Sequence, residues 1–451
     1  MGVPFDVAAF LAENEIPPDE NAYRYYDQVT QRLNGEEYRK AENAWNTVVS
    51  SQTLKEARSW KDLSPEEQKA VQDLKPVFDV FLQGAQMERG YQHSIEKMSI
   101  DSLLPFAQNS RGLVVLAKGE AFRREELKDE AGGWECLRAA MRMTRHLTRG
   151  CEIEFRIAFM DMKDLGLPIW EWLLDDRRST PLLRQAIKDL QWTVANTPPP
   201  SFQVKCNYVL TENILMKLGS EFEKLDHPSI MNIGTSQFPK PLQGPWRKCV
   251  FFGLQTIGEP KRVERLARQI CKNRLSACDL PLQERTKLTP EGTPAIQPLF
   301  TVSASESKLL SPASLHAQVK SQLLPLNSTW FPWGVDFRDQ DQVRLCSLIL
   351  VAALQVHHRE TGHYPEKLTE LVPGILDALP DDPTVGHGQT FQYRRLKEGE
   401  CQLWTSVGYG PDSEIIPELK KVQPDFEVHT DGGLTCILRG KKVTESKPQA
   451  K

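Results

Sequence analysis

The stretch that decides the fold is DQVRLCSLILVAALQVHHRETGHYPEKLTELVP, residues 341–373. Apolar side chains recur at helical spacing in its first part, which predicts a helix over 341–360 with one face in a core. Gly362 follows directly and is placed to end this helix, because glycine adopts the left-handed conformation without strain. Pro365 is suited to the first turn of a next, short helix. The core-facing positions are Val343, Leu345, Leu348, Ile349, Ala352 and Val356.

A small antiparallel sheet is expected after this corner. The segments 391–395 and 402–407 alternate apolar and polar side chains, which predicts two strands paired with each other. The segments 426–430 and 434–438 predict one more hairpin, because Asp431-Gly432-Gly433 between them is a typical turn sequence. The C-terminal part therefore combines one long helix with β-hairpins.

Helix signals begin near the N-terminus. The apolar spacing within residues 23–33 is helical. Ser64-Pro65-Glu66-Glu67 offers an N-cap, a proline at the first helical position and a capping-box glutamate. Pro76 is expected to kink or divide the helix that starts there.

From residue 112 to residue 218 the sequence predicts amphipathic helices of fairly even length. Short breaks between long helices indicate antiparallel neighbours. The stretch 127–137 is similar to the turn between paired helices of tetratricopeptide-like (TPR-like) arrays, but no fixed period recurs, so we expect irregular helical-hairpin stacking. The predicted breaks are Gly132-Gly133, Gly150, Gly166-Leu167-Pro168, Thr180-Pro181 and Pro198-Pro199-Pro200.

These patterns predict a mainly α fold with a small C-terminal α+β module, divided into four parts. Residues 1–225 form a helical-hairpin body with an extended N-terminal lead-in. Residues 226–339 form a proline-rich, irregular connector with one helix near 259–273. Residues 340–440 form the α+β module, and residues 441–451 a disordered tail.

Charge and apolar patterning exclude two classes of partner. The 451 residues include 56 basic and 60 acidic residues, so the formal charge is -4 and no net basic field attracts nucleic acid. The start of the chain lacks the pattern of a signal peptide. The longest strongly apolar stretch, 345–354, is about half the length that a membrane-spanning helix needs. A soluble chain without a membrane span is expected.

The nine cysteines lie far apart, without a C-x-x-C pair. Their spacing predicts neither a disulfide framework nor a zinc site, and their apolar surroundings favour buried free thiols.

Metal or catalytic chemistry has weak support. His357-His358-Arg359-Glu360-Thr361-Gly362-His363 is the densest group of possible ligands, and His358 and His363 are its metal candidates. Adjacent histidines on a helix point about 100° apart, so a structural or solvated role is favoured. Asp381 and Asp382 lie between prolines, where carboxylates usually cap turns. The basic pairs Arg123-Arg124 and Arg177-Arg178 are interleaved with acids and predict solvated helix faces. No cofactor is predicted.

Partner binding has a few aromatic candidates. Trp330, Phe331 and Trp333 belong to a group of four aromatics within eight residues, which predicts a binding platform or an apolar plug between two cores. The plug is favoured because aromatic side chains carry large burial energies. Tyr364 is a further candidate contact, although the geometry before Pro365 favours a ring folded back into the core.

The order of motifs in 341–412 resembles the C-terminal half of type II secretion major pseudopilins. The motifs are the long helix, Gly-x-Tyr-Pro, a leucine-rich short helix, Leu-Pro-x-Asp-Pro, an aromatic strand and Ser-x-Gly. The resemblance implies a loop that holds calcium after Ser-x-Gly, but only Asp412 and Glu414 supply carboxylates there. A pilin has its long apolar helix at the extreme N-terminus, whereas a long region precedes the helix here. Pilus-type polymerisation is therefore not expected.

The chain as a whole also resembles an uncharacterised, helix-rich protein family common in planctomycetes. That family typically has an N-terminal membrane anchor, a proline-led segment like 17–22, a helical middle and this tail. The resemblance implies a place in the cell envelope or periplasm, and either an N-terminal anchor missing from this sequence or a soluble member of the family. Free thiols and an odd cysteine count favour a reducing compartment instead, so a cytoplasmic location stays open.

The leading hypothesis is a non-catalytic protein-binding or scaffolding protein. Stacked helical hairpins offer grooves for partner peptides. The alternative is an enzyme, hydrolase-like, with a site in a cleft between the helical body and the C-terminal module. Clustered acids or histidines in a deep pocket would favour the enzyme, and a broad groove would favour the binder.

Overall fold

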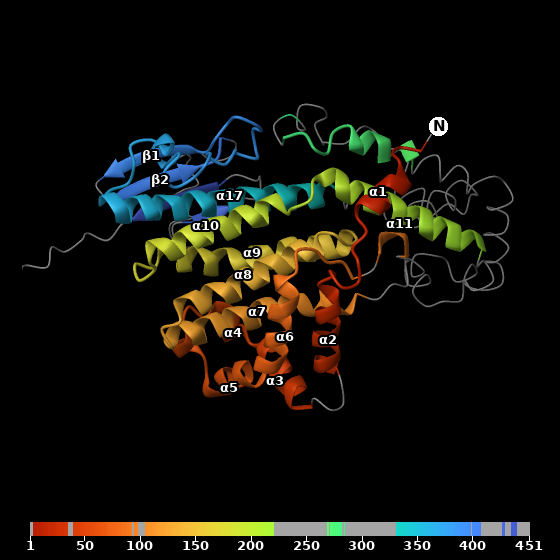
Figure 1. The fold of residues 1–451 in the computed structure, drawn as a ribbon, viewed down its shortest axis with the longest axis horizontal. Coiled ribbons are helices and arrows are strands. Elements are labelled where there is room, and N and C mark those ends of the chain that lie inside the picture. Colours follow the sequence, from red (N-terminus) through yellow and green to blue (C-terminus); the bar gives the residue numbers. More distant parts are fainter. Residues whose placement is uncertain are drawn as a thin grey trace, which may run out of the picture.

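The computed structural model of the chain is mainly helical and has a small antiparallel sheet near the C-terminus, as the sequence predicts. The helices are stacked in layers, with α2 to α6 at one end and α17 with the sheet at the other (Figure 1). The residues that the structure describes are 3–34, 39–92, 94–97, 104–220, 268–269, 271–281, 284, 331–397, 399–406, 426–428 and 434–439.

The N-terminal helices follow their capping signals. The predicted capping box is confirmed, since the Glu67 side chain accepts from the Ser64 amide at 2.8 Å and the Ser64 hydroxyl accepts from the Glu67 amide at 3.3 Å. Pro76 lies in the first turn of a new helix, which confirms the predicted division. The elements are α1 (Val7–Glu13), α2 (Tyr23–Asn34), α3 (Arg39–Ser50), α4 (Gln52–Glu56), η2 (Trp60–Asp62), α5 (Pro65–Asp73), α6 (Lys75–Gln86) and η3 (Ile95–Lys97).

The next helices are longer and form the middle layers. Neighbours along the chain pack on each other, α7 against α8 and α8 against α9. Gly150, Thr180-Pro181 and Pro198-Pro199-Pro200 lie at helix boundaries, as predicted. These helices are α7 (Pro105–Glu126), α8 (Glu130–Leu147), α9 (Glu152–Leu174), α10 (Thr180–Ala195) and α11 (Pro200–Ser220).

Two predicted breaks are wrong. The helix α9 continues through Gly166-Leu167-Pro168. A Cβ atom on Gly166 would lie 2.8 Å from Cδ of Arg344, so this glycine makes room for a neighbouring helix and does not end its own. Gly132-Gly133 lies inside the first turn of α8, because Asp129 caps that helix and the turn is completed by Lys128 at a φ of 64°.

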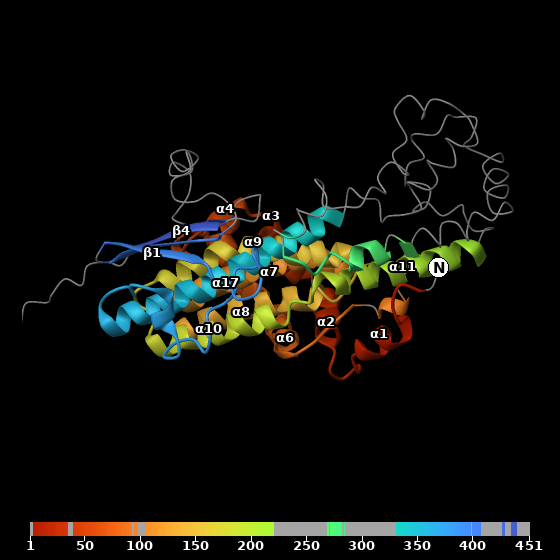
Figure 2. The same ribbon diagram turned by 90° about the horizontal axis from the view of Figure 1, so that it is seen from above.

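The long C-terminal helix α17 (Phe331–Thr361) begins ten residues before the predicted start. It therefore crosses the predicted boundary between residues 339 and 340. It packs against α9 and α10 and also contacts strands of the sheet (Figures 1 and 2). Buried apolar residues from each of α7 to α10, α17 and the sheet belong to one hydrophobic cluster, so the helical body and the C-terminal module share a core.

A buried ion pair fixes α17 against the body. Arg145 of α8 contacts Asp341 of α17 at 2.8 Å, and the side chains are 1% and 0% exposed. The same guanidinium donates to the Thr197 hydroxyl at 2.6 Å. A buried charge needs such partners, because leaving water is costly.

The antiparallel pairing of both predicted pairs of strands is confirmed, while the predicted turn at 431–433 lies outside the described residues. The strands of the sheet are β1 (Gln392–Lys397), β2 (Glu400–Trp404), β3 (Phe426–Val428) and β4 (Leu434–Arg439), in the antiparallel order β1-β2-β4-β3. Tyr393 pairs with Leu403, and the register shifts between Arg395 and Lys397. Among the described side chains of the sheet, the buried apolar ones, Cys401, Leu403 and Leu438, belong to the shared core.

The corner after α17 agrees with the expectation in part. Gly362 has a φ of +82°, as its place after the helix predicts. The following short helix is a 3₁₀ turn, η9 (Leu368–Leu371), and does not begin at Pro365. The Pro365 carbonyl accepts from the Tyr393 hydroxyl at 2.8 Å, and Glu370 accepts from the Lys367 amide at 2.9 Å. These bonds hold the segment before η9 extended and place the cap at Lys367.

Candidate functional site

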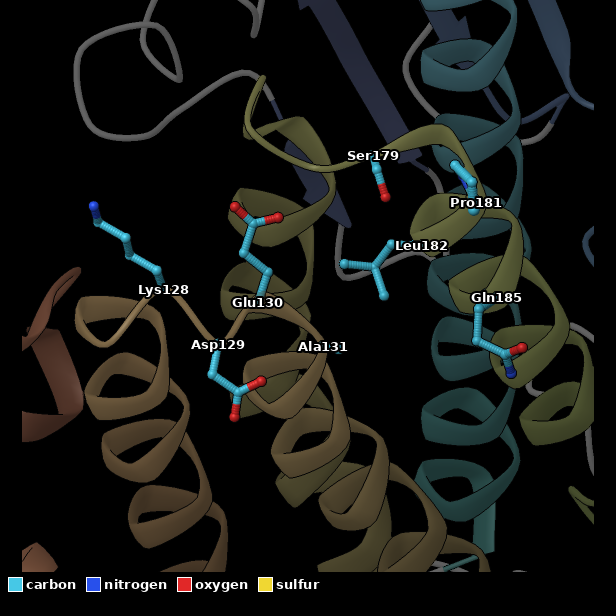
Figure 3. Close-up of a pocket in the computed structure, with 8 residues that line it drawn as sticks. All are labelled: Lys128, Asp129, Glu130, Ala131, Ser179, Pro181, Leu182 and Gln185. Atoms are coloured by element: carbon cyan, nitrogen blue, oxygen red, sulfur yellow. The ribbon is translucent and has the colours of Figure 1, made fainter.

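A shallow, largely open groove of about 520 Å³ lies where two helix-to-helix turns meet. One wall is the turn between α7 and α8, and the other is the start of α10 (Figure 3). The Glu130 carboxylate and the Ser179 hydroxyl project toward the same opening, and Leu182 lies between these walls (Figure 3). Its lining residues are Lys128, Asp129, Glu130, Ala131, Ser179, Pro181, Leu182 and Gln185.

Local sequence explains the first wall. Asp129 caps α8, and its carboxylate accepts from the Gly132 amide at 2.9 Å. This use of Asp129 leaves Glu130, the first residue of the helix, as the carboxylate that faces the groove (Figure 3). Leu127, directly before this wall, is 65% exposed.

The second wall is the N-terminal end of α10. Ser179 precedes the helix with an extended backbone, its side chain does not cap the helix, and the first turn contains no acidic residue. The first amides of a helix have no intrahelical acceptors and carry partial positive charge. Pro181 has no N–H and the Leu183 amide donates to the Ser179 carbonyl, so the amides of Thr180 and Leu182 are the ones without an intrahelical acceptor at this end of α10.

Arg178 is buried next to the groove and pairs with carboxylates near both walls. Its guanidinium lies 2.7 Å from the Glu125 carboxylate and 3.8 Å from that of Glu130, and its side chain is 1% exposed. The guanidinium carbon Cζ of Arg178 lies 4.9 Å from the centre of the Trp172 ring. Burial raises the pKa of Glu125, and Arg178 opposes this change. The prediction that Arg177-Arg178 is a solvated face is wrong for Arg178, which links the two walls.

Arg123 and Arg124 are also more structured than predicted. Both contact the Glu120 carboxylate, at 2.7 and 3.2 Å, and Glu120 is 3% exposed. Each arginine side chain is only partly exposed, at 24% and 18%, so this pair belongs to an ion-pair cluster and is not a fully solvated face.

Tyr364 lies in the core and not at a surface. Its side chain has 0% exposure, and its hydroxyl accepts from the Gln355 amide at 3.0 Å. The ring of His358 lies 4.6 Å from its ring. Tyr364 is therefore not placed to contact a partner. Trp330 lies outside the described residues, as do the side chains of Phe331 and Trp333, which begin α17.

The histidines near this corner make local contacts. His357 is hydrogen-bonded through Nδ1 to the His363 carbonyl at 3.0 Å. Burial lowers the pKa of His358, and the neighbouring Arg359 acts in the same direction. Within the described ranges, no group of three or more His, Cys, Asp or Glu side chains is arranged to hold a metal ion. The calcium candidates Asp412 and Glu414 lie outside those ranges.

We predict that purified protein carries no stoichiometric zinc, because the cysteines and histidines lack ligand spacing. Elemental analysis of the full chain checks this. About one zinc per chain, lost on His358→Ala and His363→Ala substitution, would contradict the expectation.

Asp381 and Asp382 are turn caps, as predicted. Asp382 is buried and accepts from the Thr384 amide at 3.0 Å and from the Ser406 amide at 2.6 Å. Asp381 accepts from the Gly388 amide at 3.1 Å. These bonds join the turn to the end of β2.

The described cysteines are buried free thiols, as predicted. Burial raises the pKa of six of them, all but Cys278, and to about 12 for Cys151 and Cys346, so thiolate chemistry of these six at neutral pH is disfavoured. The described cysteines are Cys136, Cys151, Cys206, Cys271, Cys278, Cys346 and Cys401.

Comparison of the chain with protein-family models, curated proteins and solved structures finds no match. The part of the chain that the structure describes has no helix both long and apolar enough to span a membrane. Sequence reasoning missed the groove, although it identified Thr180-Pro181 as a break between helices, because only packing brings this segment to the α7–α8 turn.

Proposed function

We propose that this chain is a non-catalytic protein-binding scaffold, and that the groove of Figure 3 binds an extended segment of a protein partner. The observation that carries the proposal is the pairing of a carboxylate with an uncapped helix start across a groove with apolar parts. A peptide offers both N–H donors and carbonyl acceptors, so it is complementary to both walls. The helical body supplies a rigid frame.

The groove favours one kind of segment. Ala131, Pro181 and Leu182 offer apolar surface, and Glu130 presents a carboxylate beside it. A lysine or arginine of the partner can donate to Glu130, while a neighbouring apolar side chain covers Leu182. Neither histidine nor cysteine lines this groove, so its residues form no Ser–His or Cys–His pair for catalysis. The hydrolase-like alternative stays a prediction without an observation that favours it.

We further propose that the protein works at the cell envelope, as the resemblance to the pseudopilin and planctomycete-type families implies. The element order supports this proposal, because α17, the Gly362 corner, η9 and the sheet follow each other as the pseudopilin motifs require. The tetratricopeptide-like character of the body is proposed on the stacking of α7 to α10. The same scaffold in a cytoplasmic setting remains the alternative.

The groove is tested by selecting a displayed peptide library on the full chain. Enriched peptides are expected to carry lysine or arginine next to an apolar residue. Glu130→Gln should then weaken the affinity of a selected peptide about tenfold, because a charge-assisted hydrogen bond is lost. Leu182→Asp should abolish measurable binding, because it places a second carboxylate on the apolar surface. Isothermal titration calorimetry measures both.

Glu126→Gln is the matched control. This glutamate is partly exposed at the end of α7 and pairs with Lys61, outside the groove lining. The Glu126→Gln variant should bind the selected peptide with the same affinity as the parent chain. Equal affinity of the parent chain and of Glu130→Gln and Leu182→Asp would refute the groove as the binding site.

A further inference from the structure

Asp161 on α9 is a buried carboxyl group without the usual partners. It is 1% exposed. Neither of its side-chain oxygens has a hydrogen-bond partner among the described residues. Buried polar groups are normally paired, since an unpaired carboxylate loses its hydration without compensation. The structure is therefore suited to the neutral, protonated form of this side chain.

The groups around Asp161 offset a negative charge only in part, because Ser110 and Arg111 act to lower its pKa against the larger effect of burial. Ser110 and Arg111 of α7 and Asp164 of α9 are the polar groups that influence it. The Ser110 hydroxyl donates to the Ala107 carbonyl at 2.9 Å, and Arg111 contacts the Asp164 carboxylate at 3.3 Å. Burial raises the pKa of Asp161 to about 7, and the negative charge of Asp164 adds to this effect.

The position of Asp161 connects it to the groove. It lies between α7 and α9, which pack against each other. The helix α7 leads into the wall that contains Lys128, and α9 leads into the wall that begins at Ser179. Both walls therefore follow directly, along the chain, from the two helices between which Asp161 lies.

We propose that Asp161 is a proton-sensitive contact, which holds α7 against α9 when protonated and loosens them when it ionises as the pH rises through neutrality. Its effect on the groove rests on the proposed function; the change in helix packing does not. Protonation keeps a neutral side chain in the core, and ionisation places an unpaired charge there.

The direction of the pH effect follows from linkage. In the unfolded chain an aspartate ionises near pH 4, whereas burial keeps Asp161 protonated to about pH 7 in the folded chain. The neutral form therefore stabilises the fold fully below about pH 4, and this contribution is lost as the pH rises to about 7. Above that range no further change from this group is expected.

Hydrogen–deuterium exchange of the full chain tests the proposal. After correction for intrinsic exchange rates, the opening equilibrium of amides in α7 and α9 should rise roughly 30-fold between about pH 5.5 and about pH 8. Asp161→Asn keeps the size of the neutral acid and should remove this rise. Asp164→Asn, one turn away and partly exposed, is the matched control and should retain most of the rise, because burial is the larger cause of the raised pKa.

Infrared spectroscopy of the parent chain supplies a second readout. The absorption of a protonated carboxyl should disappear with a midpoint near pH 7 and be missing in Asp161→Asn. The proposal is overturned by a pH-independent opening of the parent chain, or by an equal pH dependence in Asp161→Asn. A pH-dependent opening with an unchanged affinity for a selected peptide overturns only the link to the groove.

Discussion

Asp341→Ala is expected to destabilise the protein by about 3–5 kcal/mol, because it leaves the Arg145 guanidinium buried without its carboxylate. The two side chains are 2.8 Å apart and almost fully inaccessible to water. The Thr197 hydroxyl would remain as a neutral partner, which does not replace a charge. Urea denaturation followed by circular dichroism measures the free energy of unfolding.

Two further variants make this prediction specific to burial. Arg145→Met combined with Asp341→Leu removes both charges, and its stability should be closer to that of the parent chain than that of Asp341→Ala. Arg184→Ala breaks an exposed ion pair of α10 with Glu360, at the other end of α17, and should cost less than about 1 kcal/mol. Similar losses for Asp341→Ala and Arg184→Ala would contradict this account of how α17 is fixed.

Tyr364→Ala should destabilise the protein by an amount on the order of 3 kcal/mol, as expected for truncation of a buried aromatic side chain. The ring is completely buried in the shared core, next to His358. Tyr364→Phe keeps the ring and removes the acceptor for Gln355, so it should cost only about 1 kcal/mol. Thermal unfolding of the full-length variants separates the two effects. An unchanged midpoint for Tyr364→Ala, together with weaker peptide binding, would instead make Tyr364 a contact residue.

Sequence predicted local features well where one residue decides them. Ser64 and Pro76 act within their own helix turns, and Gly362 needs only its own backbone conformation, so their roles follow from neighbouring residues. The β-strands also follow from local alternation. Gly166 shows the limit: its role depends on Arg344, which is distant in the sequence, and a local rule therefore predicted a break where the helix continues.

The polar residues of the interior were harder to predict for the same reason. Arg178 and Asp341 are charged residues in charged surroundings, which locally indicates a solvated face. Packing of α8, α9 and α17 removes them from water and pairs them with residues from other helices. The groove likewise joins Glu130 to Ser179 through the tertiary fold, and no periodicity connects these positions.

The most direct test of the binding proposal is the exchange footprint of a selected peptide on the full chain. Binding in the groove should slow hydrogen–deuterium exchange in residues 127–131 and 179–185, and Leu182→Asp should abolish this protection. The Glu126→Gln control should show the same footprint as the parent chain. Protection confined to other segments, for example to β1 and β2, would contradict the assignment of partner binding to the groove.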